Sequence, residues 1–479
     1  MTISRREFNY GLMTAATLLG GAYRLDALSA PTQMREPLLD LQQKFLDLRF
    51  GMFIHLNMAT FEEREWGDPK ASPKLFDPAH LDTDQWAEAA ASANMGYGCL
   101  TTKHHDGFCL WPTKTNSPSV KDSSFPHDIV RSYTDSFRKR GLKVCLYLSI
   151  LDLRADIRPY QITSQKIDLI KTQLTELLTN YGEITMLIFD GWDCGWARLH
   201  YDQLPFRTIY DHIKSLQPNC LVSDHNAGQY PGPALYYSDI KEYEQHAGQK
   251  IPADSLVPSQ SGTTLQSEWF WKSDYPKQEL TSAKQIVDEW LIPFNQGHCN
   301  LILNVAPNRD GRFDQNAIAR LEEIGKLWTN PGPSPKIAAS IQITTPNLAF
   351  AKRSFASSSA DTSGPDLAND NNFRSSWMCD DGQTSGWLEI DFDQSVAFNT
   401  VSIVEARYDT ESGSKSRIES YRVQRWHDGS WSDLATGKGG NTFQLHQFER
   451  ISAERIRLVL LGSTLPPGII EFGIYNEPL

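Results

Sequence analysis

Short, continuous apolar runs alternate with longer amphipathic segments between residues 50 and 328 of this 479-residue chain. A continuous apolar run of about five residues is typical of a strand buried on both faces, as in a parallel sheet, whereas apolar residues at a spacing of three or four indicate a helix packed on one face. The pattern predicts strands at residues 50–56, 98–103, 144–150, 186–190, 220–224, 234–239, 268–271 and 299–305. It predicts helices at residues 84–95, 133–140, 164–181, 206–216, 282–295 and 315–328.

Eight strands that alternate with helices are typical of a (β/α)₈ barrel, which we expect over residues 38–330. The sixth and seventh units are irregular, with long loops around residues 229–233 and 248–262. A doubly wound open sheet is the alternative, but no glycine-rich phosphate loop opens any of the predicted helices.

A second, all-β domain is predicted after the barrel. The segment from Thr329 to Pro335 contains three prolines and cannot continue a helix, so residues 331–347 are predicted to form a stiff, solvated linker and the start of the next domain. From residue 348 to 479 the period changes to short alternating strands, at residues 386–392, 399–404, 421–426, 455–460 and 468–474. This pattern predicts an antiparallel β-sandwich.

The N-terminus has the features of an export signal. Arg5 and Arg6 precede a weakly apolar stretch at residues 10–21, and small residues suited to cleavage follow at 27–30. Residues 1–30 therefore resemble a twin-arginine signal peptide, which exports folded proteins, and we expect a periplasmic or secreted protein. The stretch is too short and too polar for a membrane span; a frayed basic end before an amphipathic helix is the alternative.

Composition narrows the range of partners. The formal net charge of -12 and a pI of about 5.5 argue against nucleic acid or an anionic membrane surface. The 13 tryptophans suggest a carbohydrate ligand, because indole rings stack on the apolar faces of sugars, although a Trp-rich core would give the same count. The seven cysteines are odd in number and form no CxxC pair, so no disulfide and no metal site of cysteines is predicted.

Polar residues gather where the predicted strands end. His55 ends the first strand, His104 and His105 follow the second, and Asp190 ends the fourth. The carboxyl ends of barrel strands form the mouth in which active sites are built, so we expect these side chains to converge there. Asp190 alone could equally cap a turn. In a regular strand His104 and His105 would point to opposite faces, so either they lie in a loop or one of them supports the other.

Two chemistries suit such a mouth. A metal hydrolase favours an HxH spacing and a water-activating metal, but this chain has no HxH at a strand end. Neutral imidazoles and carboxylates among Trp and Tyr side chains suit a sugar instead. Glycoside cleavage needs one carboxylate at the anomeric carbon and one acid to protonate the leaving oxygen.

Five motifs in residues 40–330 resemble the α-L-fucosidases of glycoside hydrolase family 29: residues 53–55, Glu65-Trp66, residues 103–108, residues 187–192 and residues 300–308. The resemblance implies a retaining exo-glycosidase that removes terminal α-L-fucosyl residues from oligosaccharides or glycoconjugates and uses no metal or other catalytic cofactor. It implies that Asp190 is the nucleophile. The substrate-binding residues that it implies are His55, Glu65, Trp66, His104, His105 and Trp271.

The acid/base is a glutamate on a variable loop in this family, often after an aromatic residue. Glu244, which follows Tyr243, fits that position best; Glu242 is the second choice and Glu268 the third. The group must start protonated, so its pKa must be raised by burial or by the nearby Asp190. In a retaining enzyme it should lie roughly 5–5.5 Å from the nucleophile.

The chain departs from the family pattern at two places. Ile188 stands where many members have Trp or Tyr, and Asp224-His225-Asn226 replaces an Asp-Arg-Trp motif. These changes leave the reaction type intact but obscure the leaving-group preference. A related exo-glycosidase for α-L-galactosides and a catalytically inactive carbohydrate-binding protein are the alternatives.

The C-terminal domain resembles the discoidin-like (F5/8 type C) modules. The matching residues are 366–370, Ser376-Trp377, 387–392 and the turn at 427–431. The resemblance implies a carbohydrate-binding type of domain and, near its first segment, a structural calcium ion. The oxygens of Asp366, Asn369 and Asp370 suit such a cation, and a solvated loop is the alternative.

Overall fold

A computed structural model describes residues 36–477, except 193, 195, 202, 228–237, 245–250, 252, 254, 256, 338–342, 344, 373–374, 411–412 and 441–442. The predicted signal peptide, residues 1–30, lies outside the described residues.

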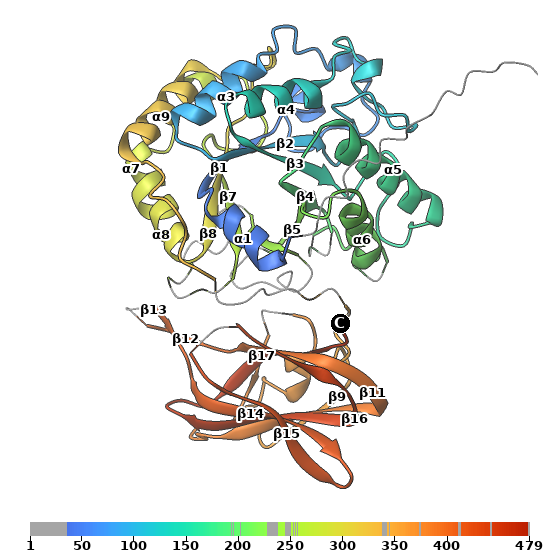
Figure 1. Cartoon of the computed structure of the whole chain (residues 1–479), viewed down its shortest axis with the longest axis vertical. Helices are drawn as coiled ribbons and strands as arrows, with labels where there is room; N and C mark the ends of the chain where they lie inside the picture. The colour runs from blue at the N-terminus through green and yellow to red at the C-terminus, as the bar shows by residue number, and fades with distance from the viewer. Residues whose placement is uncertain are drawn as a thin grey trace, which may run out of the picture. The chain divides into compact units, whose positions relative to one another are not determined.

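The first domain is a closed barrel of eight strands in which every neighbouring pair is parallel (Figure 1). The predicted (β/α)₈ fold class is therefore confirmed. The strands are β1 (Phe50–Ile54), β2 (Tyr97–Lys103), β3 (Lys143–Ser149), β4 (Met186–Asp190), β5 (Leu221–Ala227), β6 (Ile240–Tyr243), β7 (Ser259–Thr264) and β8 (Cys299–Asn304).

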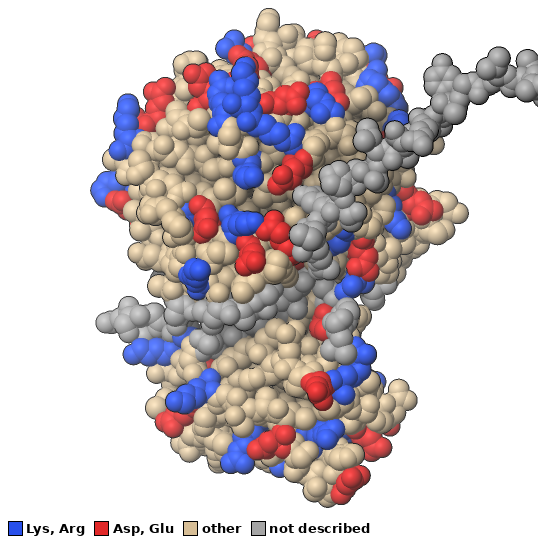
Figure 2. All heavy atoms as spheres, viewed as in Figure 1, with Lys and Arg blue, Asp and Glu red and all other residues tan. Residues whose placement is uncertain are grey.

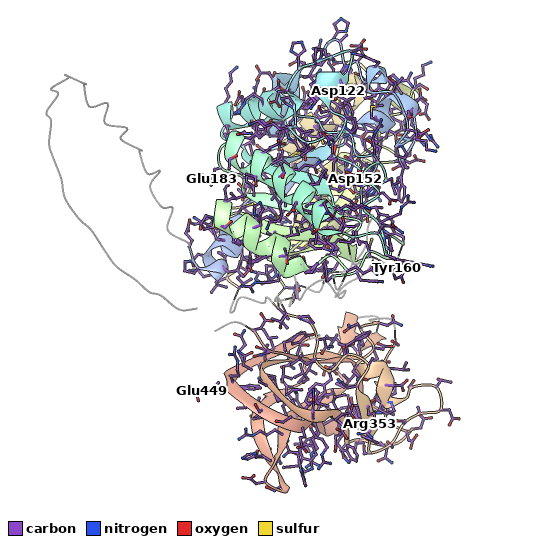
Figure 3. The ribbon with its side chains drawn as sticks, turned by 90° about the vertical axis from the view of Figure 1, so that its right-hand side faces the viewer. Asp122, Asp152, Tyr160, Glu183, Arg353 and Glu449 are labelled. Atoms are coloured by element: carbon purple, nitrogen blue, oxygen red, sulfur yellow. The ribbon has the colours of Figure 1, made fainter. Side chains whose placement is uncertain are left out.

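Helices surround the barrel, and side-chain caps fix where several of them begin. Asp82 accepts from the backbone N–H of Gln85 at the start of α3, and Asp128 accepts from that of Arg131 at the start of α4, both at 2.9 Å. Helices α5 and α6 run side by side on the outside (Figure 3). The helices are α1 (Leu38–Leu46), α2 (Met58–Glu62), α3 (Thr83–Ser92), α4 (Ile129–Lys139), α5 (Ser164–Asn180), α6 (Phe206–Leu216), α7 (Ala283–Gln285), the π-helical η5 (Ile286–Leu291), α8 (Ile292–Gln296) and α9 (Gln315–Leu327), with short 3₁₀ turns η1 (Pro73–Leu75), η2 (Val120–Asp122) and η4 (Tyr275–Lys277).

Two predicted strands are wrong in position. The seventh was expected at residues 268–271, which form a loop, whereas β7 is Ser259–Thr264. The sixth was expected at 234–239, of which 234–237 lie outside the described residues, whereas β6 is Ile240–Tyr243. Both strands are rich in polar residues, and two of these, Glu242 and Gln260, hydrogen-bond to one another within the barrel. The apolar pattern therefore did not reveal these strands.

The turn after β4 fixes the position of Asp190. All five residues of β4 are buried, as expected for a parallel strand covered on both faces. Gly191 has φ of 74°, and a Cβ on it would lie 2.6 Å from Cβ of Leu151. A side chain at position 191 would therefore be strained and would clash, so glycine is needed for the sharp turn that leaves Asp190 at the strand end.

The second domain is built on two long antiparallel strands, β11 and β16, and its predicted all-β sandwich class is confirmed. Bulges between Asp391 and Val396 and between Phe398 and Thr400 interrupt β11, so its first half pairs with β9 and its second half with β17. Residues of both halves, such as Leu388 and Ile403, share one core. The elements are β9 (Arg353–Ala356), η6 (Pro365–Ala368), β10 (Trp377–Met378), β11 (Gly386–Glu405), β12 (Tyr408–Thr410), β13 (Gly413–Lys415), β14 (Ile418–His427), β15 (Ser430–Lys438), β16 (Phe443–Ser463) and β17 (Gly468–Tyr475).

The first part of the linker is fastened to the barrel. Arg49 donates to the backbone oxygens of Gly332 and Pro333, at 3.2 and 2.7 Å, and to Oγ of Ser334 at 3.2 Å. Ser334 is buried, and Ile337 donates its N–H to Gln43 of α1. Ser334 and Ile337 are therefore buried against the barrel, whereas Pro331, Pro333 and Pro335 are exposed.

All seven cysteines are free and buried. Acidic and basic side chains are interspersed over the face drawn in Figure 2. Within the described part of the chain, no helix combines the length and the apolar character that a bilayer span requires.

Candidate active site at the mouth of the barrel

The site is organised around Asp190, which is 6% exposed at the end of β4. Its Oδ2 accepts a hydrogen bond from the Tyr147 hydroxyl at 2.6 Å, and its Oδ1 accepts from the backbone N–H of Gly191 at 2.6 Å. Tyr147 and Gly191 therefore hold the Asp190 carboxyl group in a fixed orientation.

Strand register explains which side chains surround Asp190. Ser149 on β3 and His225 on β5 lie directly beside it in the parallel ladder. Neighbours at one level of a parallel sheet point to the same face, so these three side chains share the mouth of the barrel.

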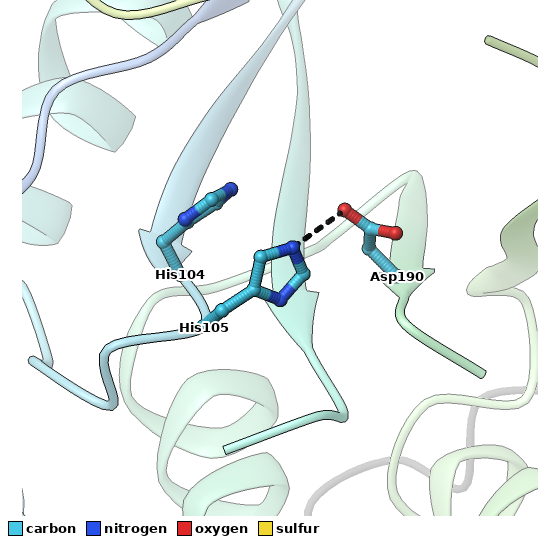
Figure 4. A group of neighbouring side chains, drawn as sticks. All are labelled: His104, His105 and Asp190. Carbon is cyan, nitrogen blue, oxygen red and sulfur yellow. Dashed lines mark ion pairs between the residues drawn. The ribbon is translucent and has the colours of Figure 1, made fainter. Parts of the chain in front are cut away.

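The paired histidines both belong to this site. Strand β2 ends at Lys103, so His104 and His105 lie in the following loop, and their rings are 4.1 Å apart. The loop removes the alternation that would have sent them to opposite faces. Figure 4 shows both rings beside Asp190, with Nε2 of His105 3.5 Å from Oδ2.

Hydrogen bonds set the tautomer of His105. Its Nδ1 lies 2.6 Å from Oγ of Ser149, and the hydroxyl of Ser149 donates to the backbone oxygen of Leu151. The hydroxyl has one hydrogen, so Nδ1 of His105 must be the donor in their contact. Burial lowers the pKa of His105 although Asp190 opposes the shift, and the neutral ring presents Nε2 as an acceptor next to Asp190.

His55 is neutral for the same kind of reason. Its Nδ1 lies 2.7 Å from Oδ1 of Asn304, whose amide nitrogen donates to the backbone oxygen of Trp269. Burial lowers the pKa of His55 to about 3. The Trp269 ring lies 5.0 Å from the imidazole and closes one side of it.

His104 is almost fully buried between two aromatic rings. It stacks on Tyr147 at 5.9 Å and meets the edge of Phe270 at 4.9 Å. Burial lowers its pKa well below the usual range, so it is neutral. Its Nδ1 has no hydrogen-bond partner among the described residues, which leaves a polar atom for a ligand to satisfy.

Glu244 follows β6 and lies opposite Asp190. One oxygen of each carboxylate and one ring nitrogen of His225 all lie within 4.8 Å of one another. Burial and the negative charge of Asp190 raise the pKa of Glu244 to about 7, although His225 opposes the shift. The acid is therefore protonated to a large extent near neutral pH.

Glu242 lies deeper in the barrel. It is fully buried and accepts a hydrogen bond from Gln260 at 2.6 Å, while its Oε2 lies 3.4 Å from Nε2 of His225. Burial lowers the pKa of His225, but the hydrogen bond and charge of Glu242 outweigh it and raise the pKa to about 9. His225 is thus a cation between Glu242 below it and the two mouth carboxylates.

Glu65 and Trp66 lie on the loop after α2. Glu65 accepts from the backbone N–H of Trp269 at 3.2 Å, and burial, together with the nearby Glu268, raises its pKa to about 8. Trp66 packs its ring 4.8 Å from His105. Glu268, the third choice for the acid/base, pairs with Lys272, and hydrogen bonds with Glu65 and then Lys272 lower its pKa.

Trp271 lies apart from the histidines. Its indole N–H donates to Asp314 at 2.8 Å, and its ring packs with Tyr275 and Ala306. Trp269 contacts His55 instead. Sequence reasoning also missed Tyr147 and Asn304; the alternation of Cys145, Tyr147 and Ser149 on β3, level with Asp190, was the signal that could have found Tyr147.

Two groups have the spacing of metal ligands: His104, His105 and Asp190, and Asp190, His225 and Glu244, each with ligand atoms within 4.8 Å. A protonated imidazole has no lone pair for a metal, so the cationic His225 disfavours the second group. Neutral His104 and His105 beside a carboxylate fit a borderline cation or the hydroxyls of a sugar.

The residues predicted to hold a calcium ion lie in the sandwich. Asn369 is buried, donates to the backbone oxygens of Ala349 and Lys352, and leaves its Oδ1 without a partner in the described part of the chain. Glu471 is fully buried; burial and the nearby Asp370 raise its pKa well above the usual range. Asp370 accepts from Asn372 and Ser375. Asp366 is exposed.

A closed parallel barrel with a carboxylate pair and neutral imidazoles at the carboxyl ends of its strands defines a glycosidase-like enzyme. Residues 60–332 match the α-L-fucosidase family and residues 354–471 the F5/8 type C domain. The family match covers more than half of the chain, which therefore belongs to the α-L-fucosidase family of glycoside hydrolases.

Relatives agree with this assignment. The chain is 28% identical to alpha-L-fucosidase 1 of Arabidopsis thaliana over 89% of this chain and 85% of that one. It is 25% identical to tissue alpha-L-fucosidase of Mus musculus over 54% and 56%. A crystal structure of a glycoside hydrolase 29 family member from an unknown rumen bacterium shares the fold, with a TM-score of 0.52, 23% identity and coverage of 92% and 77%.

Proposed function

We propose that this enzyme is a retaining exo-α-L-fucosidase that acts through a covalent fucosyl-enzyme. One observation supports the proposal most: oxygens of the Asp190 and Glu244 carboxyl groups lie within 4.8 Å of one another at the barrel mouth, the first hydrogen-bonded to Tyr147 and the second with a pKa raised to about 7. Retaining glycosidases need carboxyl groups roughly 5–5.5 Å apart, whereas inverting enzymes need a wider gap for water.

In the first step, Oδ of Asp190 attacks the anomeric carbon of the α-L-fucoside. The glycosidic C–O bond breaks, and Glu244 gives its proton to the departing oxygen, so the leaving alcohol departs neutral. The products are a fucosyl ester of Asp190 and the carboxylate of Glu244.

In the second step, the ionised Glu244 takes a proton from water as the water oxygen attacks the anomeric carbon. The ester bond to Asp190 breaks, and fucose leaves with its original configuration. Two inversions at one carbon give net retention, and both carboxyl groups return to their starting states.

Neighbouring groups support these states. The hydroxyl of Tyr147 and the N–H of Gly191 orient the Asp190 carboxylate toward attack. The His225 cation near both carboxyl groups favours the ionised form of Glu244 that remains after the first step.

The buried imidazoles suit recognition of the fucose ring. His55, His104 and His105 are neutral, and each can pair with a hydroxyl without the cost of burying a charge. Glu65 and Trp66 would complete the contacts at the rim. Trp271 remains in the proposed substrate-binding set on the resemblance alone, because its described contacts are with Asp314, Tyr275, Ala306 and Arg309.

No catalytic cofactor is part of the proposal, because the two carboxyl groups supply the nucleophile and the proton. In the sandwich, we propose that a structural calcium ion is held near Asn369 and Asp370. The carboxyl group of Asp370 lies near that of the buried Glu471, and Oδ1 of Asn369 has no partner among the described residues, so oxygens that suit a hard cation are present.

The proposed location is the periplasm or the exterior, after export of the folded chain. Arg5 and Arg6 before the weakly apolar stretch support it. Fractionation of cells that express the native chain and an Arg5→Lys, Arg6→Lys variant tests it: the variant should stay in the cytoplasm.

Azide rescue tests the mechanism. Asp190→Gly should lose activity on aryl α-L-fucosides by a factor of at least about 10³, and azide should restore turnover with β-L-fucosyl azide as product. Glu244→Ala with azide should instead give α-L-fucosyl azide. If wild-type protein binds fucose without turning over any α-L-fucoside, or prefers α-L-galactosides, the proposed activity is wrong.

A further inference from the structure

Two exposed indoles stand together beside the active site. Trp66 and Trp196 are 44% and 45% exposed, and their ring centroids are 5.1 Å apart at an angle of 56°. All 13 tryptophans are described, and only these two exceed two fifths exposure. They come from different parts of the chain, the loop after α2 and the loop after β4, so the barrel brings them together.

Both rings rest on the histidine that touches the nucleophile. The centroid of His105 lies 4.8 Å from that of Trp66 and 5.2 Å from that of Trp196. Nε2 of His105 is in turn 3.5 Å from Oδ2 of Asp190. The imidazole of His105 therefore contacts both the indole pair and the Asp190 carboxyl group.

The exposed fractions of the side chains indicate which part of the substrate these indoles can contact. His55, His104 and His105, which suit the fucose ring, are between 2% and 5% exposed. A group that is nearly half exposed at the rim meets the part that protrudes from such a pocket. In an exo-glycosidase that part is the leaving group.

We propose that Trp196, with Trp66 at its inner edge, forms an aromatic platform for the leaving-group sugar, a pyranose that presents an apolar face of axial C–H bonds. The inference rests on the proposed fucosidase activity and adds a binding site for the second sugar. An indole exposed to water lacks the favourable free energy of burying its large apolar surface. Stacking on the apolar face of a sugar would bury part of that surface.

Two substrates separate this role from a role in chemistry. α-L-Fucosyl fluoride has no leaving-group sugar, whereas an α-L-fucosyl-N-acetylglucosamine disaccharide has one. Trp196→Ala should lower kcat/KM for the disaccharide about tenfold, mainly through KM, and should change that for the fluoride by less than about twofold. Trp196→Phe should recover part of the loss, because it restores an aromatic face.

Leu327→Ala is the matched control. Leu327 is 57% exposed and ends α9, at the face of the barrel opposite the strand carboxyl ends, so both substrates should be unaffected. Equal losses on both substrates in Trp196→Ala, or no loss on either, would overturn the platform. If the wild-type enzyme hydrolyses neither the fluoride nor the disaccharide, the proposed activity itself fails, which is a different result.

Discussion

The hydroxyl of Tyr147 donates a 2.6 Å hydrogen bond to the Asp190 carboxylate. The two residues lie on adjacent strands, and the phenol is fully buried beside His104 and His55. Burial and the Asp190 charge raise the pKa of Tyr147, so the phenol keeps its proton and remains a donor at every pH of interest.

Removal of that hydroxyl should therefore slow the reaction without unfolding the barrel. A hydrogen bond to a charged group contributes about 1.5–3 kcal/mol, so Tyr147→Phe should lower kcat/KM for an aryl α-L-fucoside about 10- to 100-fold. Steady-state kinetics with a melting curve measure both effects. An unchanged kcat/KM would show that Gly191 alone orients Asp190.

The rate should fall as pH rises through about 7. Glu244 must be protonated to act as the acid, and burial with the Asp190 charge raises its pKa to about 7. We expect kcat/KM to lose one decade per pH unit above that value. Glu244→Gln, assayed on a fluoride leaving group that needs little protonation, should lack this limb. Glu65, whose pKa is raised to about 8, is the competing group, and Glu65→Gln should keep the limb if Glu244 causes it.

Glu242 and Glu244 should differ in what their loss affects. Glu242 is buried and pairs with His225, and breaking a buried pair typically costs about 3–5 kcal/mol, so Glu242→Ala should lower Tm strongly. Glu244→Ala should leave Tm almost unchanged and respond to azide. Parallel melting curves and azide assays decide between them; azide rescue of Glu242→Ala alone would reverse the assignment.

Calcium should stabilise the sandwich at neutral pH. Burial raises the pKa of Glu471, so without a cation the contribution of this group to stability is greatest at low pH and falls as pH rises toward its folded-state pKa. A bound cation favours the carboxylate and should offset this loss. Calorimetric melting curves, recorded with calcium and with a chelator, should show that calcium raises Tm at pH 7.5 but not at pH 4.5. In Glu471→Gln the rise should be absent.

The sequence predicted the barrel where strands are apolar and was wrong where they are polar. The run Met186–Asp190 matched its strand end to end. Strand β7, Ser259–Thr264, has no large apolar residue. Its buried Gln260 is instead hydrogen-bonded to Glu242 and to Tyr97 inside the barrel. Such a polar strand is explained by the closed barrel, inside which its side chains find hydrogen-bond partners.

The mouth residues were predictable as a set, but their partners were not. A strand-end aspartate and a pair of histidines signal a barrel mouth from sequence alone. The contact of Trp269 with His55, and that of Trp271 with Asp314, depend on how the loop after β7 turns. Trp269 and Trp271 lie two positions apart in the sequence, and the sequence alone did not indicate which of them contacts His55.

The grip of Arg49 on Gly332 and Pro333 changes where the catalytic domain ends. A chain cut at Asn330 would leave this buried guanidinium facing three lost acceptors, the two backbone oxygens and the Ser334 hydroxyl. A fragment meant to fold alone should continue through Ile337, because residues 332–337 form hydrogen bonds to Arg49 and Gln43 of the barrel domain.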